Sequence, residues 1–471
     1  MSSSILILII LLVLSSSKRE AAIMISVRSS ISRSTRQLIP FASNSTQKPF
    51  HNVQNKIGAR AVLSARTLST TSPPPFLVEQ WEGWEAGKLV LSNSDCEPIK
   101  QSTLLAMADA ECKARWDDLD LGYGHQKGCE HLRADILETF SKDSLTGIED
   151  FTDEGKTSSN NPPLTIEDIN VVVPAEGIFL TMNALLEEGD EVVVAMPCYQ
   201  SLHQLAESIG CKVKPWLPTI SDRPGNDSFS LGPDNTKFYN FSISDLEKLI
   251  TPSTKMVVMN FPHNPTGAMI TEGELNRIVR ACEKNDCYLF NDEMYKYLEH
   301  KGKATLPSVA GIYDKGISLG GVSKWGSLAG IRIGWVVSQN KEVMEKIAQL
   351  KDYTTISSSR PAEVLASIGI RNRNLIIQNN LDIIHEGKGY LKSFAQVHSE
   401  HFEWIEPEGG SFAFLRLKNE KASPYVRKLA EKANLSVMPS DLFVRGGDDS
   451  LRVCFGRSDA IEMIEAWSKH L

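Results

Sequence analysis

A lysine and an arginine eight positions apart are the residues of this chain whose types and spacing most clearly suggest chemistry. Lys324 and Arg332 lie in a run of mostly small residues, 321–334, which reads GVSKWGSLAGIRIG. The ε-amine of a lysine can form a Schiff base with an aldehyde, and a guanidinium can hold a phosphate. Pyridoxal phosphate needs both groups, so the run favours a site for this cofactor over a surface lysine in a glycine-rich loop.

Two further motifs follow predicted strands. Residues 260–267 read NFPHNPTG, and residues 291–295 read NDEMY. Each run comes directly after an apolar stretch, so both would lie on loops at the carboxyl ends of strands, where α/β proteins bind their ligands. The polar side chains of Asn264, Asp292 and Tyr295 are therefore candidate site residues, although an ordinary Asn-Pro turn would also explain the first motif.

Together the three runs resemble the signature motifs of class I and class II aminotransferases, which are fold type I pyridoxal-phosphate enzymes. They match the lysine signature, the D-E-x-Y segment and, apart from Phe261 and His263 at tolerant positions, the NPxNPTG segment of that family. The resemblance covers roughly residues 85–471. It implies that Lys324 forms an aldimine with the cofactor. It also implies that Asn264 donates to the cofactor's phenolic oxygen, which Tyr295 shares. Asp292 would keep the pyridine nitrogen protonated, so that the ring accepts electrons from the substrate.

The cofactor phosphate is expected to be bound jointly by Arg332 and a helix start. The turn VPAEG at 173–177 enters a helix, and free N–H groups at a helix start attract anions. Relatives commonly have a Gly-Ala or Gly-Ser pair in this turn, whereas this chain has Pro174, which has no N–H. We therefore assign the backbone contacts to Ala175 and Glu176.

Three other positions are assigned by the same resemblance. Many relatives carry a phosphate-binding serine three positions before the lysine, where this chain has Gly321, and Ser323 is expected to compensate. Tyr199 matches the aromatic residue that stacks on the pyridine ring, although a core tyrosine is the alternative. Tyr123 resembles the tyrosine that reaches the phosphate of the neighbouring subunit, which implies a homodimer with shared active sites.

Substrate binding is expected from Arg452, with Asn264 beside it. Arg452 lies in the strand-like run SLRVCF, about 20 residues from the chain end. An arginine suits the α-carboxylate of an amino acid because its planar fork binds a carboxylate bidentately. Dicarboxylate-specific relatives carry a second arginine, and Arg360 and Lys351 lie in a segment that lines the site in relatives. We expect these two residues to be surface residues rather than substrate contacts.

The pattern from about residue 165 onward predicts an α/β fold. Strands are expected at 171–173, 191–195, 212–216, 256–260 and 288–291. These are mostly continuous apolar runs, which are typical of a parallel sheet covered by helices on both faces. Capping-box patterns at Ser244 with Glu247 and at Thr271 with Glu274 predict helix starts between the strands. The family resemblance implies, more specifically, the fold of fold type I pyridoxal-phosphate transferases.

The domain organisation is predicted as follows. Residues 75–110 form an N-terminal arm, residues 111–354 a large cofactor-binding domain with a mostly parallel sheet, and residues 355–471 a smaller C-terminal α+β domain. The last part should contain a long helix, a few strands and a final helix that ends near His470. Polar stretches at 152–163 and 221–238 are expected to be exposed insertions.

The first 74 residues are expected to be a targeting segment without fixed structure. Residues 5–14 are apolar but too few to span a bilayer. The following stretch to about Thr71 is rich in Ser, Thr and Arg and poor in acids, as transit peptides are. We expect a mitochondrial matrix protein. The alternatives are a bipartite plastid signal, since the apolar run comes before the basic one, and an ordinary disordered tail.

Composition excludes several other classes. Residues 1–78 hold nine Lys or Arg and one Glu, so the remainder has 41 basic against 57 acidic residues. Such an acidic body argues against a nucleic-acid partner. The eight cysteines and ten histidines show no metal-ligand spacing, so no metal is expected. The thiols should be reduced and buried, and no run is long enough to predict a membrane helix.

The resemblance implies transamination. An L-amino acid would pass its amino group to the cofactor, and a 2-oxo acid would collect it in the second half of a ping-pong cycle. One alternative keeps the cofactor but changes the reaction to carbon–sulfur β-elimination or cyclisation, because such enzymes share the fold and the motifs. The other alternative is a non-enzymatic sensor or scaffold, which the complete catalytic set disfavours.

Overall fold

The computed structural model describes residues 73–85, 88–140, 162–222, 236–300, 302–444, 447 and 449–471. Nearly all of the expected targeting segment and the larger parts of both expected insertions lie outside these residues. The predictions made for those segments therefore stay predictions.

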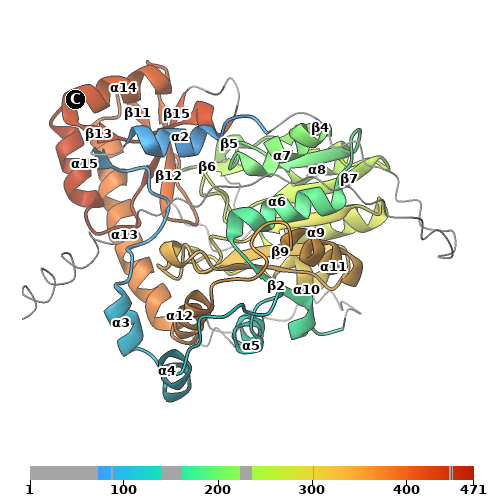
Figure 1. The fold of residues 1–471 in the computed structure, drawn as a ribbon. Helices are drawn as coiled ribbons and strands as arrows, with labels where there is room; N and C mark the ends of the chain where they lie inside the picture. Colours follow the sequence, from blue (N-terminus) through green and yellow to red (C-terminus); the bar gives the residue numbers. More distant parts are fainter. Residues whose placement is uncertain are drawn as a thin grey trace, which may run out of the picture. The chain divides into compact units, whose positions relative to one another are not determined.

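The helices and strands alternate along the central part of the chain (Figure 1). The helices are α2 (Leu77–Trp84), α3 (Gln101–Ala106), α4 (Ala110–Asp117), α5 (Glu130–Glu138), α6 (Pro174–Leu185), α7 (Ser201–Ile209), α8 (Ile243–Leu249), α9 (Glu272–Lys284), α10 (Val309–Ile312), α11 (Lys341–Lys351), α12 (Arg360–Arg371), α13 (Arg373–Val397), α14 (Ala422–Ala433) and α15 (Ala460–Ser468), with short 3-10 turns η2 (Ile166–Asp168), η3 (Ala329–Ile331) and η4 (Ser440–Leu442). The strands are β1 (Leu89–Val90), β2 (Ile169–Val172), β3 (Glu191–Ala195), β4 (Lys212–Trp216), β5 (Thr219–Asp222), β6 (Lys237–Asn240), β7 (Thr254–Met259), β8 (Tyr288–Asp292), β9 (Gly316–Gly321), β10 (Gly334–Val337), β11 (Phe402–Glu403), β12 (Phe412–Leu417), β13 (Leu435–Ser436), β14 (Met438–Pro439) and β15 (Ser450–Cys454).

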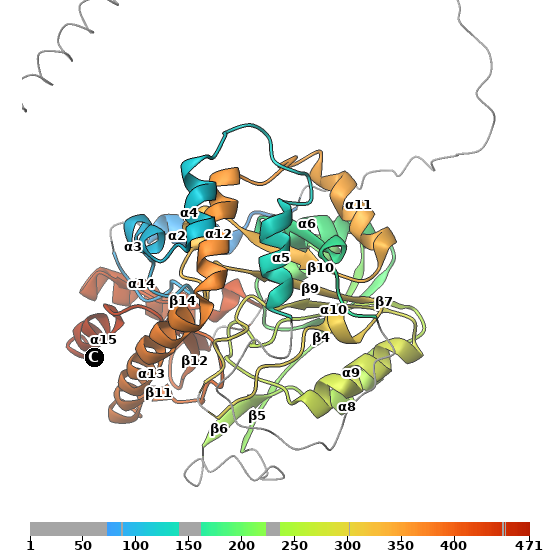
Figure 2. The same ribbon diagram turned by 90° about the horizontal axis from the view of Figure 1, so that it is seen from below.

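A seven-stranded, mostly parallel sheet forms the centre of the fold. Its strand order is β2-β10-β9-β8-β7-β3-β4, and only β10 runs antiparallel to its neighbours. Helices cover both faces, with α8 and α9 on one side and α6 and α11 on the other (Figure 2). The predicted α/β fold with a mostly parallel sheet between helices is confirmed.

The buried side chains explain why this sheet is covered on both faces. Along β3, Val192 and Val194 pack with α6, α7 and α11, while Val193 and Ala195 pack with α8, α9 and α10. Successive side chains of a strand point to opposite faces, so a continuous apolar run buries both of them. Complete burial of one such valine contributes about 1.5–3 kcal/mol.

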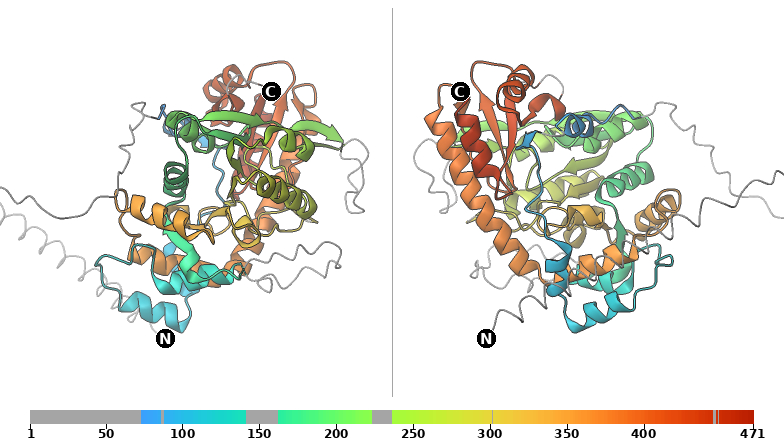
Figure 3. Two further views of the ribbon diagram at one scale, coloured as in Figure 1. Left: turned by 90° about the vertical axis from the view of Figure 1, so that its right-hand side faces the viewer. Right: turned by 60° about the vertical axis from the view of Figure 1, so that its left-hand side comes forward.

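The C-terminal part contains a second sheet and the longest helix. Strands β11, β12, β15 and β14 form an antiparallel sheet in that order. Helix α13 runs beside this sheet (Figure 3), where its Phe394 contacts Phe402 of β11 and Trp467 of α15. We expected one long helix here, and the structure has two, because α12 ends at Arg371 and α13 begins at Arg373, with Asn372 between them. Asn372 donates its side-chain amide to the Ile368 carbonyl.

The N-terminal arm is fastened to the C-terminal part. Strand β1 pairs in parallel with β13. Glu85, at the end of α2, is buried and accepts hydrogen bonds from Trp81 Nε1 (2.8 Å), Ser92 Oγ (2.6 Å) and Ser436 Oγ (2.6 Å). A buried carboxylate is stable only when donors surround it, so Glu85 holds the arm in place.

Two local predictions were wrong. Helix α8 begins earlier than the capping pattern suggested, because Ser242 rather than Ser244 is its N-cap and accepts from the Asp245 N–H. The stretch 221–238 is not wholly an exposed insertion, because its ends belong to the antiparallel pair β5 and β6. The cap at Thr271, with Glu274 closing the capping box, is confirmed.

Candidate active site

A cavity of about 440 Å³ opens at the carboxyl ends of the central strands and contains most of the predicted site residues. Nine of the eleven line it: Ala175, Tyr199, Asn264, Asp292, Tyr295, Ser323, Lys324, Arg332 and Arg452. They come from segments up to about 280 residues apart in the sequence, so the fold alone brings them together. Glu176 and Tyr123 do not line the cavity.

Lys324 follows strand β9 on a tight loop. Its Nζ donates a hydrogen bond to Ser94 Oγ (2.9 Å) and lies 5.6 Å from the centre of the Tyr295 ring. Trp325, the next residue, is buried in the core and fixes the loop. Sequence reasoning missed Ser94, because the arm that carries it matches no motif.

The glycine at 321 has a packing explanation. A Cβ at Gly321 would lie 3.1 Å from Gly334 Cα, 3.1 Å from the Ile333 carbonyl oxygen and 3.2 Å from a methyl carbon of Met294. A serine there would therefore need its neighbours to move. The Oγ of Ser323, by contrast, is buried against the cavity and has no hydrogen-bond partner in the described part of the chain. An unpartnered hydroxyl in that position fits an acceptor supplied by a ligand.

Asp292 ends strand β8 and is 6% exposed. Its Oδ1 accepts from the Met294 N–H (3.1 Å). Burial raises its pKa from the ordinary 3.8 to about 7, against the opposing effects of that hydrogen bond and of the positive charge on Lys324. No ion pair with Asp292 occurs among the described residues. A buried carboxylate at the cavity wall is therefore suited to a protonated ring nitrogen.

Asn260 connects the loop that carries Asn264 to the end of β8. Its Oδ1 accepts from the Asn264 N–H (2.8 Å), and its Nδ2 donates to the Asp292 carbonyl (2.5 Å). The loop then turns at Gly267, whose φ of 69° is readily adopted only by glycine. Asn264 and Asp292 are held on the same rim of the cavity by this single side chain.

Arg452 is 2% exposed and reaches the cavity from β15. Its guanidinium donates to Asn264 Oδ1 (3.1 Å) and to the Ser92 carbonyl (2.7 Å), and it lies 4.9 Å from the centre of the Phe443 ring. Its Nε is buried without a partner in the described residues. The planar fork is thus fixed in orientation and still has donor capacity for an incoming carboxylate.

The start of α6 and Arg332 both contribute to the cavity wall. The first intrahelical bond of α6 runs from the Gly177 N–H to the Val173 carbonyl, so the N–H groups of Ala175 and Glu176 are not used inside the helix. The carboxylate of Glu176 accepts from the Val173 N–H and from the hydroxyls of Thr354 and Thr355. The negative charge of Glu176 is therefore bound by these protein donors. The contact of the Ala175 and Glu176 N–H groups with the cofactor phosphate stays a prediction.

Tyr199 lines the cavity next to a residue that sequence reasoning missed. Its hydroxyl donates to Glu79 Oε1 (3.4 Å), and its ring centre lies 5.3 Å from that of Phe76. Glu79 and Val78 reach the cavity from α2. The sequence did not indicate these two residues, because no family motif includes α2.

Three other candidates lie away from this cavity. Tyr123 is 85% exposed. Arg360 forms an ion pair with Asp120, and Lys351 donates to the Gln126 carbonyl (2.6 Å). The expectation that Lys351 is a surface residue was wrong: its side chain is fully buried, and burial lowers its pKa.

A second cavity, of about 430 Å³, is lined by Arg115, Cys129, His131, Arg360 and Glu363 among others. Cys129 Sγ lies 3.2 Å from His131 Nε2, but burial raises the pKa of the thiol and lowers that of the imidazole to about 4. Both groups are then neutral near pH 7, so this pair lacks a thiolate nucleophile.

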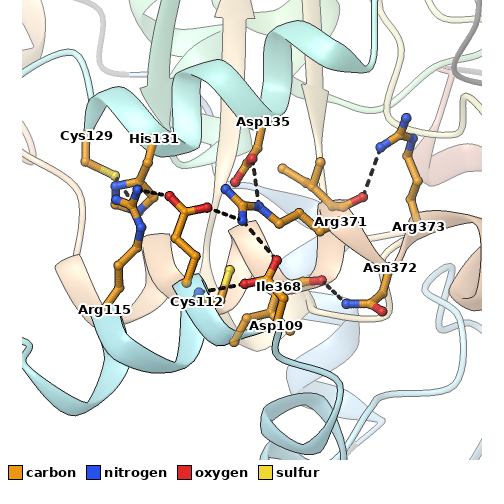
Figure 4. A network of polar contacts seen from close by, with 12 residues as sticks. Asp109, Cys112, Arg115, Cys129, His131, Asp135, Ile368, Arg371, Asn372 and Arg373 are labelled. Carbon is orange, nitrogen blue, oxygen red and sulfur yellow. Dashed lines mark hydrogen bonds and ion pairs between the residues drawn. The ribbon is translucent and has the colours of Figure 1, made fainter.

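The polar network beside the second cavity has a structural task (Figure 4). Arg371 of α12 donates to Asp135 of α5 (2.9 Å), and to Asp109 (2.9 Å) and Glu111 (2.7 Å) at the start of α4. Arg371 therefore connects α12 to both α4 and α5 through hydrogen bonds between charged groups. Most of the site residues predicted from the sequence line the cavity of Lys324 instead.

Comparison with known proteins agrees with this arrangement. The family described as "Aminotransferase class I and II" matches residues 166–464. The chain is 28% identical to capreomycidine synthase of Streptomyces vinaceus, over 60% of this chain and 68% of that protein. It is 24% identical to an aspartate aminotransferase of Thermotoga maritima, over 62% and 72%.

Solved structures share the fold. A PLP-dependent aminotransferase from Streptococcus suis superposes with a TM-score of 0.69 at 23% identity, covering 85% of this chain and 98% of that one. The PLP-dependent cyclase OrfR gives the same TM-score and identity, covering 87% and 99%. At such identities the likeness shows the fold alone.

Proposed function

The chain belongs to the class I and class II aminotransferase family, and on that premise we propose that it is a pyridoxal-phosphate-dependent transaminase that moves an amino group from an L-amino acid to a 2-oxo acid. The family match covers residues 166–464, which include all the predicted site residues except Tyr123. The observation that carries the proposal is that Lys324 and Asp292 line one cavity with Asn264, Arg332 and Arg452.

The residues present fit the cofactor. Asp292 is a buried carboxylate without an ion-pair partner among the described residues, and Ser323 Oγ is buried and unpartnered within the same part of the chain. Arg332 and the free N–H groups at the start of α6 would hold the phosphate. Tyr199 would stack on the ring, and Asn264 and Tyr295 would bind its phenolic oxygen. When bound, pyridoxal 5′-phosphate would supply an aldehyde for the lysine and a ring that accepts electrons.

The chain's own groups would then perform the remaining steps. Arg452 would bind the substrate α-carboxylate and orient the α-hydrogen, because Asn264 and the Ser92 carbonyl already fix its guanidinium. Nζ of Lys324 would take the α-proton. Its position suits this task, because Nζ lines the cavity and is held there by its hydrogen bond to Ser94 Oγ.

A second reaction is favoured by one of the similar proteins. The relative named capreomycidine synthase is not named as a transaminase, so elimination or cyclisation on the same cofactor is the alternative. Dependence of amino-acid consumption on an added 2-oxo acid would support transamination. Release of pyruvate from a sulfur amino acid without any acceptor would support a carbon–sulfur lyase instead.

The test has two readouts. Borohydride reduction of the loaded protein should attach the cofactor to the peptide that contains Lys324, as read by mass spectrometry. A panel of amino donors with 2-oxoglutarate or pyruvate should then show turnover that Lys324→Ala lowers at least about a thousandfold. Lys346→Ala, at an exposed position of α11, is the matched control and should behave like the wild type. Cofactor on another lysine, or equal turnover by Lys324→Ala, would refute the proposal.

We also propose a homodimer. Leu121 and Tyr123 are 81% and 85% exposed, and Tyr353 on the neighbouring loop is 90% exposed. The two loops contact each other, since Gln126 donates to the Ala348 carbonyl and to Asp352. Large exposed apolar side chains on adjacent loops are typical of an interface. Sedimentation equilibrium would test this, with Tyr353→Ser as the variant expected to weaken the dimer.

The cellular location remains a proposal that rests on residues 1–74, nearly all of which lie outside the described residues. Their composition supports import into the mitochondrial matrix, with a plastid as the alternative. A fluorescent fusion that carries these residues would distinguish the two. The structure describes no helix long and apolar enough to cross a membrane in the part of the chain that it covers.

A further inference from the structure

Five charged side chains line the cavity of Lys324, and the proposed function uses only four of them. Asp292, Lys324, Arg332 and Arg452 would serve the ring nitrogen, the reacting carbon, the phosphate and the α-carboxylate. The fifth is Glu79 on α2. A carboxylate that faces this cavity would repel a negatively charged substrate side chain and attract a positively charged one.

The position of Glu79 is fixed by the segment around it. The Leu77 N–H donates to Gln200 Oε1 (2.8 Å), and Gln200 Nε2 donates to the Pro75 carbonyl (2.9 Å). Val78 is buried in the core beneath the helix start. The first turn of α2 is therefore seated on the chain that precedes α7, and these contacts hold the backbone of Glu79 beside the cavity.

The carboxylate of Glu79 is available to a ligand. It accepts one hydrogen bond, from the Tyr199 hydroxyl at 3.4 Å, and forms no ion pair within the residues that the structure describes. That single contact leaves most of its acceptor capacity unused, because an ionised carboxylate can accept about four hydrogen bonds. Tyr199 would orient the group without neutralising it.

We propose that Glu79 is a specificity-determining residue that binds the distal group of the amino donor and selects amino acids whose side chain carries an amine or a guanidinium. This inference rests on the proposed function, because it uses Arg452 as the partner of the α-carboxylate. Arg452 would bind the negatively charged end of the donor and Glu79 the positively charged end, so the donor would bind in one orientation only. Aspartate and glutamate would be poor donors, because their second carboxylate would meet Glu79.

Binding of substrate-like probes that cannot react tests this inference separately from turnover. The probes are 5-guanidinopentanoate and its neutral analogue 5-ureidopentanoate, both of which lack the α-amino group. Calorimetry with the cofactor-loaded protein should show about fivefold tighter binding of the guanidinium probe, the upper range for a partly exposed charge pair. In Glu79→Gln, which keeps an acceptor for Tyr199, the ratio should fall to about one.

A second variant keeps the negative charge on α2 but moves it away from the cavity, which separates a direct contact of Glu79 from a general charge effect. Gln80 is exposed and lies outside the cavity lining, so Glu79→Gln combined with Gln80→Glu keeps the charge of α2. This double variant should lose the preference as Glu79→Gln does. Retention of the preference in either variant, or equal binding of the two probes by the wild type, would overturn the role of Glu79.

The two proposals fail in different ways. An enzyme that transaminates neutral donors and binds both probes equally would leave the proposed function intact and remove Glu79 from substrate selection. An enzyme that prefers the guanidinium probe but transaminates no donor would overturn the proposed reaction instead. Steady-state turnover of L-arginine against L-citrulline should follow the binding ratio, with the difference appearing in kcat/KM.

Discussion

Replacing Asp292 with asparagine should stabilise the cofactor-free protein, although it removes a residue central to the proposed site. Burial raises the pKa of this carboxyl from 3.8 to about 7. The folded state therefore keeps a proton that the unfolded chain releases as the pH rises through about 4. The contribution of this carboxyl to the unfolding free energy is complete below that pH. It decreases as the pH rises to about 7, where the carboxyl of the folded state also ionises.

The magnitude follows from the two pKa values. A difference of about three corresponds to a loss of about 4 kcal/mol of unfolding free energy between pH 4 and pH 8. The side chain introduced by Asp292→Asn would carry no charge to desolvate and would still accept from the Met294 N–H through its amide oxygen. The apo-variant should therefore resemble the wild type near pH 4 and exceed it by up to about 4 kcal/mol at pH 8.

The assay is urea unfolding of the cofactor-free proteins at both pH values, followed by the same measurement after loading with pyridoxal phosphate. The cofactor should stabilise the wild type more than the variant, because a protonated ring nitrogen would pair with the carboxylate but not with an amide. Two results would refute the reasoning. One is an apo-variant less stable than the wild type at pH 8, and the other is equal stabilisation of both proteins by the cofactor.

Other substitutions follow from contacts in the structure. Arg452→Lys should lower kcat/KM for amino donors about a hundredfold, mainly through KM, because a lysine cannot reproduce the fork held by Asn264; an unchanged KM in steady-state kinetics would contradict this. Arg371→Ala should lower the unfolding free energy by about 3 kcal/mol, because Asp135 would remain buried without its cation; urea midpoints would measure it. Thr271→Ala should cost about 1 kcal/mol through loss of the α9 cap, with thermal unfolding as the readout and no effect on kcat.

The sequence predicted the parallel strands well, because both faces of the sheet are buried and the strands are continuous apolar runs. Strands β3 and β4 begin and end at the expected residues. Strands β9 and β10 were not anticipated. Strand β9 reads GISLGG, and its glycines lower the strand propensity of the run. Close packing nevertheless requires a residue without a side chain at Gly321. The cap at Ser242 was missed because Ser244 with Glu247 offers the more complete motif.

The candidate site was likewise predicted from the sequence only in part. Residues with family motifs, such as Lys324 and Asp292, were identifiable because their chemistry fixes both type and spacing. Ser94 and Glu79 were not, because they reach the cavity only after the arm folds back over the body. The prediction that Lys351 is a surface residue was wrong, because a lysine is rarely buried. No local pattern indicates that the Gln126 carbonyl would accept a hydrogen bond from its ammonium group.

The attachment of the first helix to Gln200 limits how far the chain can be shortened from its beginning. A protease, or a designer of an expression clone, that cut after Glu85 would remove the Pro75 carbonyl and the Leu77 amide that Gln200 uses, together with Val78 and Glu79 of the cavity wall. The central sheet and Lys324 lie outside the stretch that such a cut removes. A chain shortened to this point would lose one wall of the pocket, and with it the proposed selectivity for donors with a positively charged side chain.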